Sequence, residues 1–181
     1  MKRMLTPFVL AGLAAVATPA ATMAQDAPVA KAEDVGSIDG AISALYGVIS
    51  GPAGQARDWN RFRSLFAPGA RLMPTGKDQA GAGRIRVWSP DDYVQTAGGN
   101  LEKNGFFERE IGRTMERYGN IVQVMSAYES RRLAQDEKPF ARGINGIQLW
   151  NDGTRWWIAS IFWEQESPAT PIPAKYLTPH Q

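Results

Sequence analysis

The chain has 181 residues, with 20 basic and 18 acidic side chains and no cysteine. Without cysteine it has neither a disulfide nor a thiolate metal ligand, and its only histidine, His180, is the penultimate residue, so no zinc or copper site is predicted. Lys2 and Arg3 account for the net charge of +2. Without the first 24 residues the charges balance, which excludes the basic surface typical of nucleic-acid binding.

The first 24 residues have the pattern of a cleavable signal peptide. A positive start at Lys2 and Arg3 precedes an uncharged apolar run over residues 8–17 and then small residues up to Ala24. The run is short for a bilayer span, which takes about 20 residues, and an uncleaved anchor is the alternative. We therefore expect an exported protein, periplasmic or secreted, without membrane contact after cleavage. Residues 25–36 are predicted to be a disordered leader.

Three helices are predicted in the first half of the mature chain. Ser37 can cap a helix whose apolar residues recur at i, i+3, i+4 and i+7, and which ends before Gly51. Asp58 caps a shorter helix, and Arg57 beside it is predicted to face solvent. Ser89, followed by a proline and two aspartates, caps a third helix.

Strands dominate the second half. After short strands at 71–73 and 85–88, with a flexible stretch at 77–83 between them, four long segments alternate in polarity: 106–117, 121–131, 142–150 and 154–164. Short loops in sequence join antiparallel neighbours, so these four form a meander. Helices followed by strands indicate an α+β domain over residues 37–166. A proline-rich tail, 167–181, is expected to be extended and to lie over the domain surface.

Five segments carry a resemblance to a known superfamily: residues 46–51, 58–70, 124–131, 142–149 and 155–163. In order and sequence they resemble the helix that enters the first strand and the three closing strands of NTF2-like (SnoaL-like) proteins, which have a cystatin-like cone. The resemblance implies N-terminal helices packed on a curved antiparallel sheet, with a pocket inside the cone. Enzymes of this superfamily place an Asp–His pair, or a tyrosine and an aspartate, in that pocket, but this chain has no histidine to put there.

Two glutamates are the candidates for proton transfer. Glu108 and Glu110 are two residues apart on a strand and share one face. In the cone either can act as a general base while Tyr128 and Arg142 orient a carbonyl or carboxylate; the alternative is cross-strand ion pairs on the outer face. Asn145 is predicted to point away from the face of Arg142. The residues expected to line the pocket are Trp59, Phe62, Tyr93, Phe106, Tyr128, Arg142, Gln148 and Trp163.

The tryptophans suggest an interface. Trp156 and Trp157 are adjacent, so they face opposite sides of the sheet. Trp157 is grouped with Ile161 and Trp163 on an apolar face, which leaves Trp156, together with Trp150, for an exposed aromatic patch. Because aromatic residues are enriched in interface cores, we expect a homodimer through the outer sheet face. The alternative is a surface tryptophan covered by the C-terminal tail.

The expected function is binding of a small apolar or amphipathic molecule in the cone, without defined catalysis and without a metal ion or cofactor. A lyase or isomerase that uses a pocket carboxylate and a tyrosine is the second candidate. A non-catalytic accessory protein is the third. An open cavity with a buried glutamate would indicate catalysis, an open cavity without one a carrier, and a filled cone the accessory role.

Overall fold

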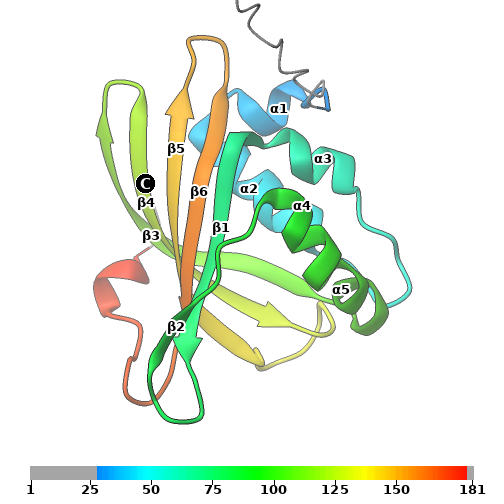
Figure 1. The fold of residues 1–181 in the computed structure, drawn as a ribbon, viewed down its shortest axis with the longest axis vertical. Helices are drawn as coiled ribbons and strands as arrows, with labels where there is room; N and C mark the ends of the chain where they lie inside the picture. The colour runs from blue at the N-terminus through cyan, green and yellow to red at the C-terminus, as the bar shows by residue number, and fades with distance from the viewer. Residues whose placement is uncertain (1–27, 179–181) are drawn as a thin grey trace, which may run out of the picture.

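Helices cover one face of a strongly curved sheet (Figure 1). The structure is a computed structural model that describes residues 28–178, so the predicted signal peptide, residues 1–24, lies outside the described residues. The elements are α1 (Ala32–Val35), α2 (Ile38–Ile49), α3 (Trp59–Ser64), β1 (Phe66–Lys77), β2 (Gly83–Ile85), α4 (Pro90–Tyr93), the π-helix η1 (Val94–Gly98), α5 (Gly99–Asn104), β3 (Phe107–Tyr118), β4 (Ile121–Arg131), β5 (Ala141–Asn151), β6 (Trp156–Gln165) and the 3₁₀-helix η2 (Ala174–Tyr176).

The strands form a six-stranded sheet in the order β2-β1-β6-β5-β4-β3. The predicted meander of four long strands, β3 to β6, is confirmed, and its pairs are antiparallel. The first strand differs from the prediction. β1 runs through the predicted short strand at 71–73 and up to Lys77, and it pairs in parallel with β6. Two prolines and two glycines within β1 resemble strand breakers, but a register shift between Phe66 and Arg71 accommodates the first proline and the first glycine.

The N-terminal helices pack as the apolar stripe predicts. The Ser37 hydroxyl accepts a hydrogen bond from the Gly40 amide at 2.9 Å, and the stripe of α2 is buried against the sheet. Residues 25–27 of the predicted disordered leader lie outside the described residues, and in its described part residues 32–35 form α1. Asp34 in this helix is 3% exposed and accepts two 2.7 Å hydrogen bonds from the Arg61 guanidinium of α3. This part-buried ion pair ties the start of the domain to α3.

Arg57 corrects another expectation, since it is buried rather than solvent-facing. Its side chain is 7% exposed, and its guanidinium donates to the carbonyl groups of Ile49, Gly51 and Leu101 at 3.0, 2.6 and 3.3 Å. A buried arginine is tolerated where its donors are satisfied. Here it holds the end of α2, the loop after it and α5 together below the cone.

Alternation along the strands separates an inner face, toward the helices, from an outer one. In β5, Asn145 points inward and is buried, whereas Gln148 points outward and is exposed. In β6, Ala159 has no partner because the register shifts there. This extra residue puts Trp156 on the inner face and in the core, and Trp157 on the outer face. The predicted grouping of Trp157 with Ile161 and Trp163 is therefore wrong.

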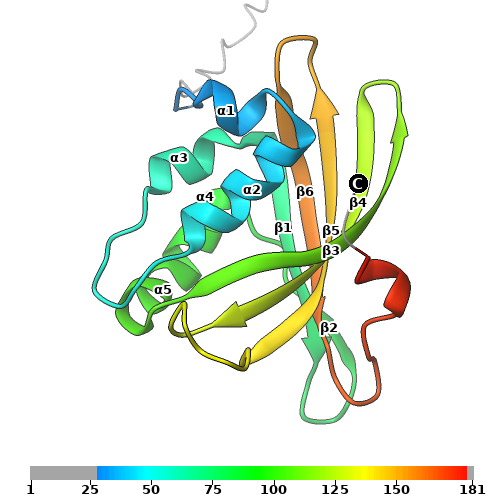
Figure 2. The ribbon, with the colours of Figure 1, turned by 180° about the vertical axis from the view of Figure 1, so that it is seen from behind.

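The C-terminal tail lies on the side of the sheet opposite α2 (Figure 2). Its 3₁₀-helix η2 packs against β3, and the Arg113 amide donates to the Thr178 carbonyl at 3.4 Å. The described part of the tail, residues 167–178, leaves Trp150 43% exposed and so does not cover the aromatic patch. Among residues 28–178, no helix is long and apolar enough to cross a membrane.

Candidate functional site

A cavity of about 210 Å³ lies inside the cone, between the helices and the inner face of the sheet. Its wall is mostly apolar, with a carboxyl, an amide and two phenol groups among the lining side chains, which suits recognition of a small molecule. Helices α2 to α5 supply one side, and all the long strands supply the other. The lining residues are Leu45, Ile49, Phe62, Leu72, Tyr93, Leu101, Phe106, Glu108, Tyr128, Asn145, Ile161 and Trp163.

Five of the eight residues expected to line the pocket do line this cavity: Phe62, Tyr93, Phe106, Tyr128 and Trp163. Trp59 stands behind them, because its ring packs edge-on against Phe62 at 5.7 Å and its indole nitrogen donates to Glu102 at 2.9 Å. Arg142 and Gln148 lie on the outer face, so the expectation that they reach the interior is corrected. The inward residues of β5 are the alternate set, which includes Asn145.

Glu108 is the acidic side chain of the cavity wall. Burial raises the pKa of its carboxyl from 4.5 to about 7, although hydrogen bonds from Ser130 and Asn145 act in the opposite direction. The Ser130 hydroxyl donates to Oε2 of Glu108 at 2.7 Å. A carboxyl with such a pKa is present in both protonation states near neutral pH, as a group that takes up and returns a proton requires.

A chain of hydrogen bonds links Glu108 to Glu110. The Asn145 side chain donates to Glu108 and, through Nδ2, to the Tyr46 hydroxyl at 3.0 Å. The Tyr46 hydroxyl lies 2.7 Å from the Ser126 hydroxyl, which donates to Oε1 of Glu110 at 2.6 Å. Buried polar groups that are all hydrogen-bonded hold one arrangement firmly. The chain therefore fixes the orientation of Asn145 beside the Glu108 carboxyl.

Glu110 shares the inner face with Glu108, as predicted, but lies in a different environment. It does not line the cavity, and its Oε2 lies 3.6 Å from the Arg113 guanidinium. Arg113 also pairs with Asp39 of α2. Glu110 thus belongs to an ion-pair group at the start of α2, whereas Glu108 faces the hollow.

Two tyrosines complete the polar part of the cavity. Burial, and secondarily the charge of Glu108, raise the pKa of both Tyr93 and Tyr128 above the ordinary value of 10.0. Both phenols are therefore neutral donors at physiological pH. Tyr128 lies over Gly143, where a Cβ atom would come within 2.6 Å of the phenol oxygen. A glycine at that position is what gives the Tyr128 ring its room.

Four polar residues of this site were not identified from the sequence: Tyr46, Ser126, Ser130 and Asn145. Tyr46 occupies a position of the buried stripe of α2, where a core aromatic is the ordinary expectation. Ser126 and Asn145 pair with each other across β4 and β5. The sequence does show that Asn145 lies on the face of β5 that does not carry Arg142. It does not show which of the two faces points into the cone, and that is needed to place Asn145 in the site.

Comparisons with known proteins bear on the fold. Neither a protein-family model nor a curated protein matches the sequence. A protein of unknown function from Nostoc punctiforme with a cystatin-like fold is 12% identical, with 71% of this chain and 87% of that chain covered and a TM-score of 0.52.

Two further solved structures are similar at lower TM-scores. An NTF2-like protein of unknown function from Methylobacillus flagellatus is 12% identical, covering 72% of this chain and 95% of its own, at 0.47. A putative ketosteroid isomerase from Kribbella flavida is 14% identical, covering 83% and 94%, at 0.40. The similarity to the Nostoc structure, together with helices packed on one face of a curved sheet, identifies the fold of this chain as the NTF2-like, cystatin-like cone.

Proposed function

We propose that the protein binds a small, largely apolar molecule in the interior cavity and moves a proton on it, as an isomerase or lyase does. The observation that carries this proposal is the Glu108 carboxyl, which faces an apolar hollow with its pKa raised to about 7. An ordinary surface glutamate is almost fully ionised at pH 7 and is a weak base there. Binding without catalysis is the second candidate, and the cavity alone would serve it.

The roles follow from the geometry of the wall. Glu108, when ionised, takes a proton from a carbon next to a carbonyl group, so that the C–H electrons move into the carbonyl and its oxygen becomes negative. Neutral Tyr93 or Tyr128 donates a hydrogen bond to that oxygen. In an isomerase Glu108 then returns the proton to another carbon of the same molecule. In a lyase the electrons return from the oxygen to form a C=C bond, the bond to the leaving group breaks, and Glu108 gives its proton to the departing group. Asn145 and Ser130 hold the carboxyl in one orientation throughout.

The test is deuterium exchange into small cyclic ketones and enones in D₂O, followed by NMR. We expect the wild-type protein to exchange protons next to the carbonyl, and Glu108→Gln to lose the exchange by about a hundredfold or more. Glu116→Gln is the matched control, because Glu116 is an exposed glutamate of the same strand. Tyr128→Phe should reduce the rate less than Glu108→Gln does.

Two results would contradict this proposal, the first by showing no catalysis and the second by showing catalysis without Glu108. If ketones raise the melting temperature of the wild-type protein but their protons do not exchange, the protein binds them without catalysis, which supports the carrier role. Exchange that survives in Glu108→Gln at the wild-type rate would remove Glu108 from the reaction.

A further inference from the structure

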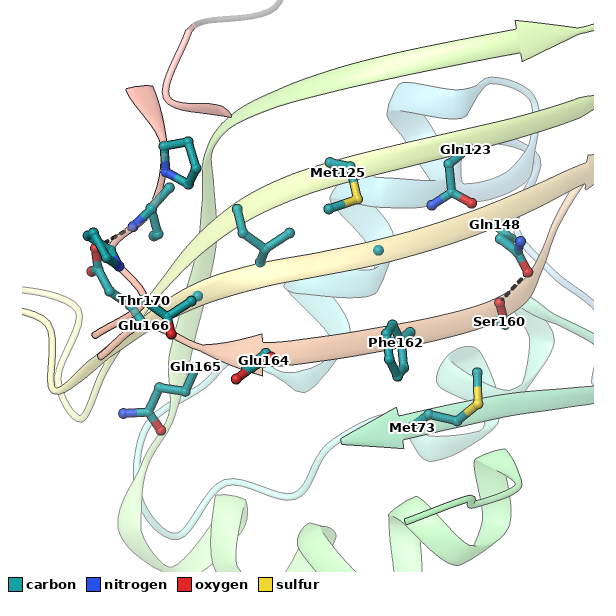
Figure 3. Close-up of a pocket in the computed structure, with 16 residues that line it drawn as sticks. Met73, Gln123, Met125, Gln148, Ser160, Phe162, Glu164, Gln165, Glu166 and Thr170 are labelled. Atoms are coloured by element: carbon teal, nitrogen blue, oxygen red, sulfur yellow. Dashed lines mark hydrogen bonds between the residues drawn. The ribbon is translucent and has the colours of Figure 1, made fainter. Parts of the chain in front are cut away.

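A second hollow lies on the other side of the sheet, between its outer face and the C-terminal tail (Figure 3). Its volume is about 540 Å³, within the range of roughly 300–1,000 Å³ typical of small-molecule sites. It shares no lining residue with the interior cavity, from which the sheet separates it. We call it the outer pocket.

The floor of the outer pocket is apolar, and one of its residues is a glycine without a side chain. One row across the sheet consists of Met73, Phe162, Gly146 and Met125 on β1, β6, β5 and β4. Gly146 contributes only backbone, so a trough opens between the side chains of Met125 and Phe162 (Figure 3). Phe162 is 49% exposed, which is a large apolar side chain left in contact with water. Flexible methionines adapt to ligands of different shape.

The tail forms one wall. Thr170 to Pro173 line the pocket, and the Ile172 amide donates to Oε1 of Glu166 at 2.9 Å, which ties the wall to the end of β6. Prolines on either side of Ile172 restrict the backbone. The wall is therefore already in place before a ligand arrives, which lowers the entropic cost of binding.

The charges at the two ends of the pocket differ. At the far end, the Ser160 hydroxyl donates to Gln148 at 2.7 Å, and both groups are neutral. At the tail end lie two carboxylates, Glu164 and Glu166, which are the charged side chains among the described lining residues. Arg142 lies 3.3 Å from Glu166 and offsets its charge. Glu164 is exposed and leaves one negative charge at this end.

From this combination we propose that the outer pocket is a second ligand site, for an extended amphipathic molecule with an apolar body and a cationic end group. The apolar body lies in the trough over Gly146, between Met125 and Phe162. The cationic group lies against Glu164. An anionic amphipath is disfavoured by the same carboxylate. This site is independent of the proton-transfer proposal for the interior cavity.

The probes are three amphipaths with the same alkyl chain: dodecyltrimethylammonium, dodecanol and dodecanoate. The two ionic probes are used below their micellar concentrations, and dodecanol within its solubility. Affinities are measured by isothermal titration calorimetry on the mature protein. We expect dodecyltrimethylammonium to bind at least about fivefold more tightly than dodecanoate, with dodecanol between them. Glu164→Gln should remove the difference between the charged probes and leave the dodecanol affinity unchanged.

Two further variants locate the alkyl chain of the bound probe. Phe162→Ala should weaken binding of all three probes by about fivefold or more, because apolar contact area is lost. Phe162 is half-exposed, so the variant should fold, and circular dichroism checks that it does. Glu108→Gln, in the interior cavity, should leave all three affinities unchanged.

Three results would overturn the proposal. Probe affinities that are unchanged in Phe162→Ala would show that the alkyl chain binds outside the outer pocket. Probe affinities that change in Glu108→Gln but not in Phe162→Ala would show that the alkyl chain binds in the interior cavity. A wild-type dimer that Phe162→Ala converts to a monomer, seen by sedimentation, would show that a second copy of the chain covers this face.

Discussion

At the scale of single residues, the environment of Glu108 decides what the interior cavity can do. Two hydrogen bonds from Ser130 and Asn145 favour the ionised carboxyl, yet burial outweighs them, and the pKa rises to about 7. Glu110, only two residues away on the same face, lies beside the Arg113 guanidinium instead. Two neighbouring carboxyl groups of one strand are thus given different roles by what packs against them.

The raised pKa of Glu108 predicts a pH dependence of stability. In the unfolded chain this carboxyl titrates near 4.5, and in the folded protein near 7. Between these values the folded state holds a proton that the unfolded state has lost, so the free energy of unfolding falls as pH rises from about 4.5 to about 7. Glu108→Gln lacks this group. Its stability relative to wild type should therefore rise over that interval, by on the order of 2–3 kcal/mol at most.

Urea denaturation at several pH values between about 5 and 8 measures this difference. Glu116→Gln serves as the control and should run parallel to wild type, since its side chain is exposed. A constant offset between Glu108→Gln and wild type across the whole range would mean that Glu108 is ionised with an ordinary pKa.

At the scale of elements, the tail packs closely against β3 because Gly112 has no side chain there. Gly112 follows a register shift in β3, and a Cβ atom there would lie 2.5 Å from the Tyr176 carbonyl oxygen and 2.7 Å from the Leu177 carbonyl carbon. Real Cβ atoms do not approach backbone so closely. The close seat of the 3₁₀-helix η2 on the sheet therefore depends on glycine at this position.

Gly112→Ala should displace the tail without unfolding the domain. Hydrogen–deuterium exchange of the amides in residues 174–178 should become faster by about tenfold or more, because their contacts with β3 are lost. Gly76→Ala is the control, since a Cβ atom at Gly76 meets nothing within 4 Å. Unchanged exchange in Gly112→Ala would show that the tail is held by other contacts.

At the scale of the whole molecule, the ends of the two long hairpins present an apolar row on the outer face. Tyr118, Ile121, Trp150 and Trp157 are successive partners across β3 to β6. The first three are 85%, 58% and 43% exposed. Exposed aromatic rows of this kind are typical of interface cores. We expect a homodimer through this row, with Trp157 and not the buried Trp156 as its fourth member.

Trp150→Glu should convert that dimer to a monomer with the same circular dichroism, because a charge in the row would be buried without a partner. Light scattering coupled to size exclusion gives the mass. Leu133→Glu is the control, because Leu133 is 47% exposed in the loop after β4 and lies outside the row. A wild-type monomer, or a dimer that survives Trp150→Glu, would reject this interface.

The local sequence by itself determined the elements that depend on neighbouring residues. The caps at Ser37 and Ser89 and the four long strands of alternating polarity all formed as predicted. Each rests on contacts within a few residues, which a pattern in the sequence can report. The order of these elements indicated an α+β domain, and their resemblance to NTF2-like proteins implied the cone, with a hollow that contains Glu108 and Tyr128.

Only the tertiary structure decided which face of each strand is inward. A period of two separates Asn145 from Arg142 but does not say which one meets the helices. One unpaired residue at Ala159 reverses the faces on either side of it. The parallel pairing of β1 with β6 and the burial of Arg57 also depend on segments far apart in the chain. Contacts of that range leave no periodic trace in the sequence, and they are the ones that shape both the interior cavity and the outer pocket.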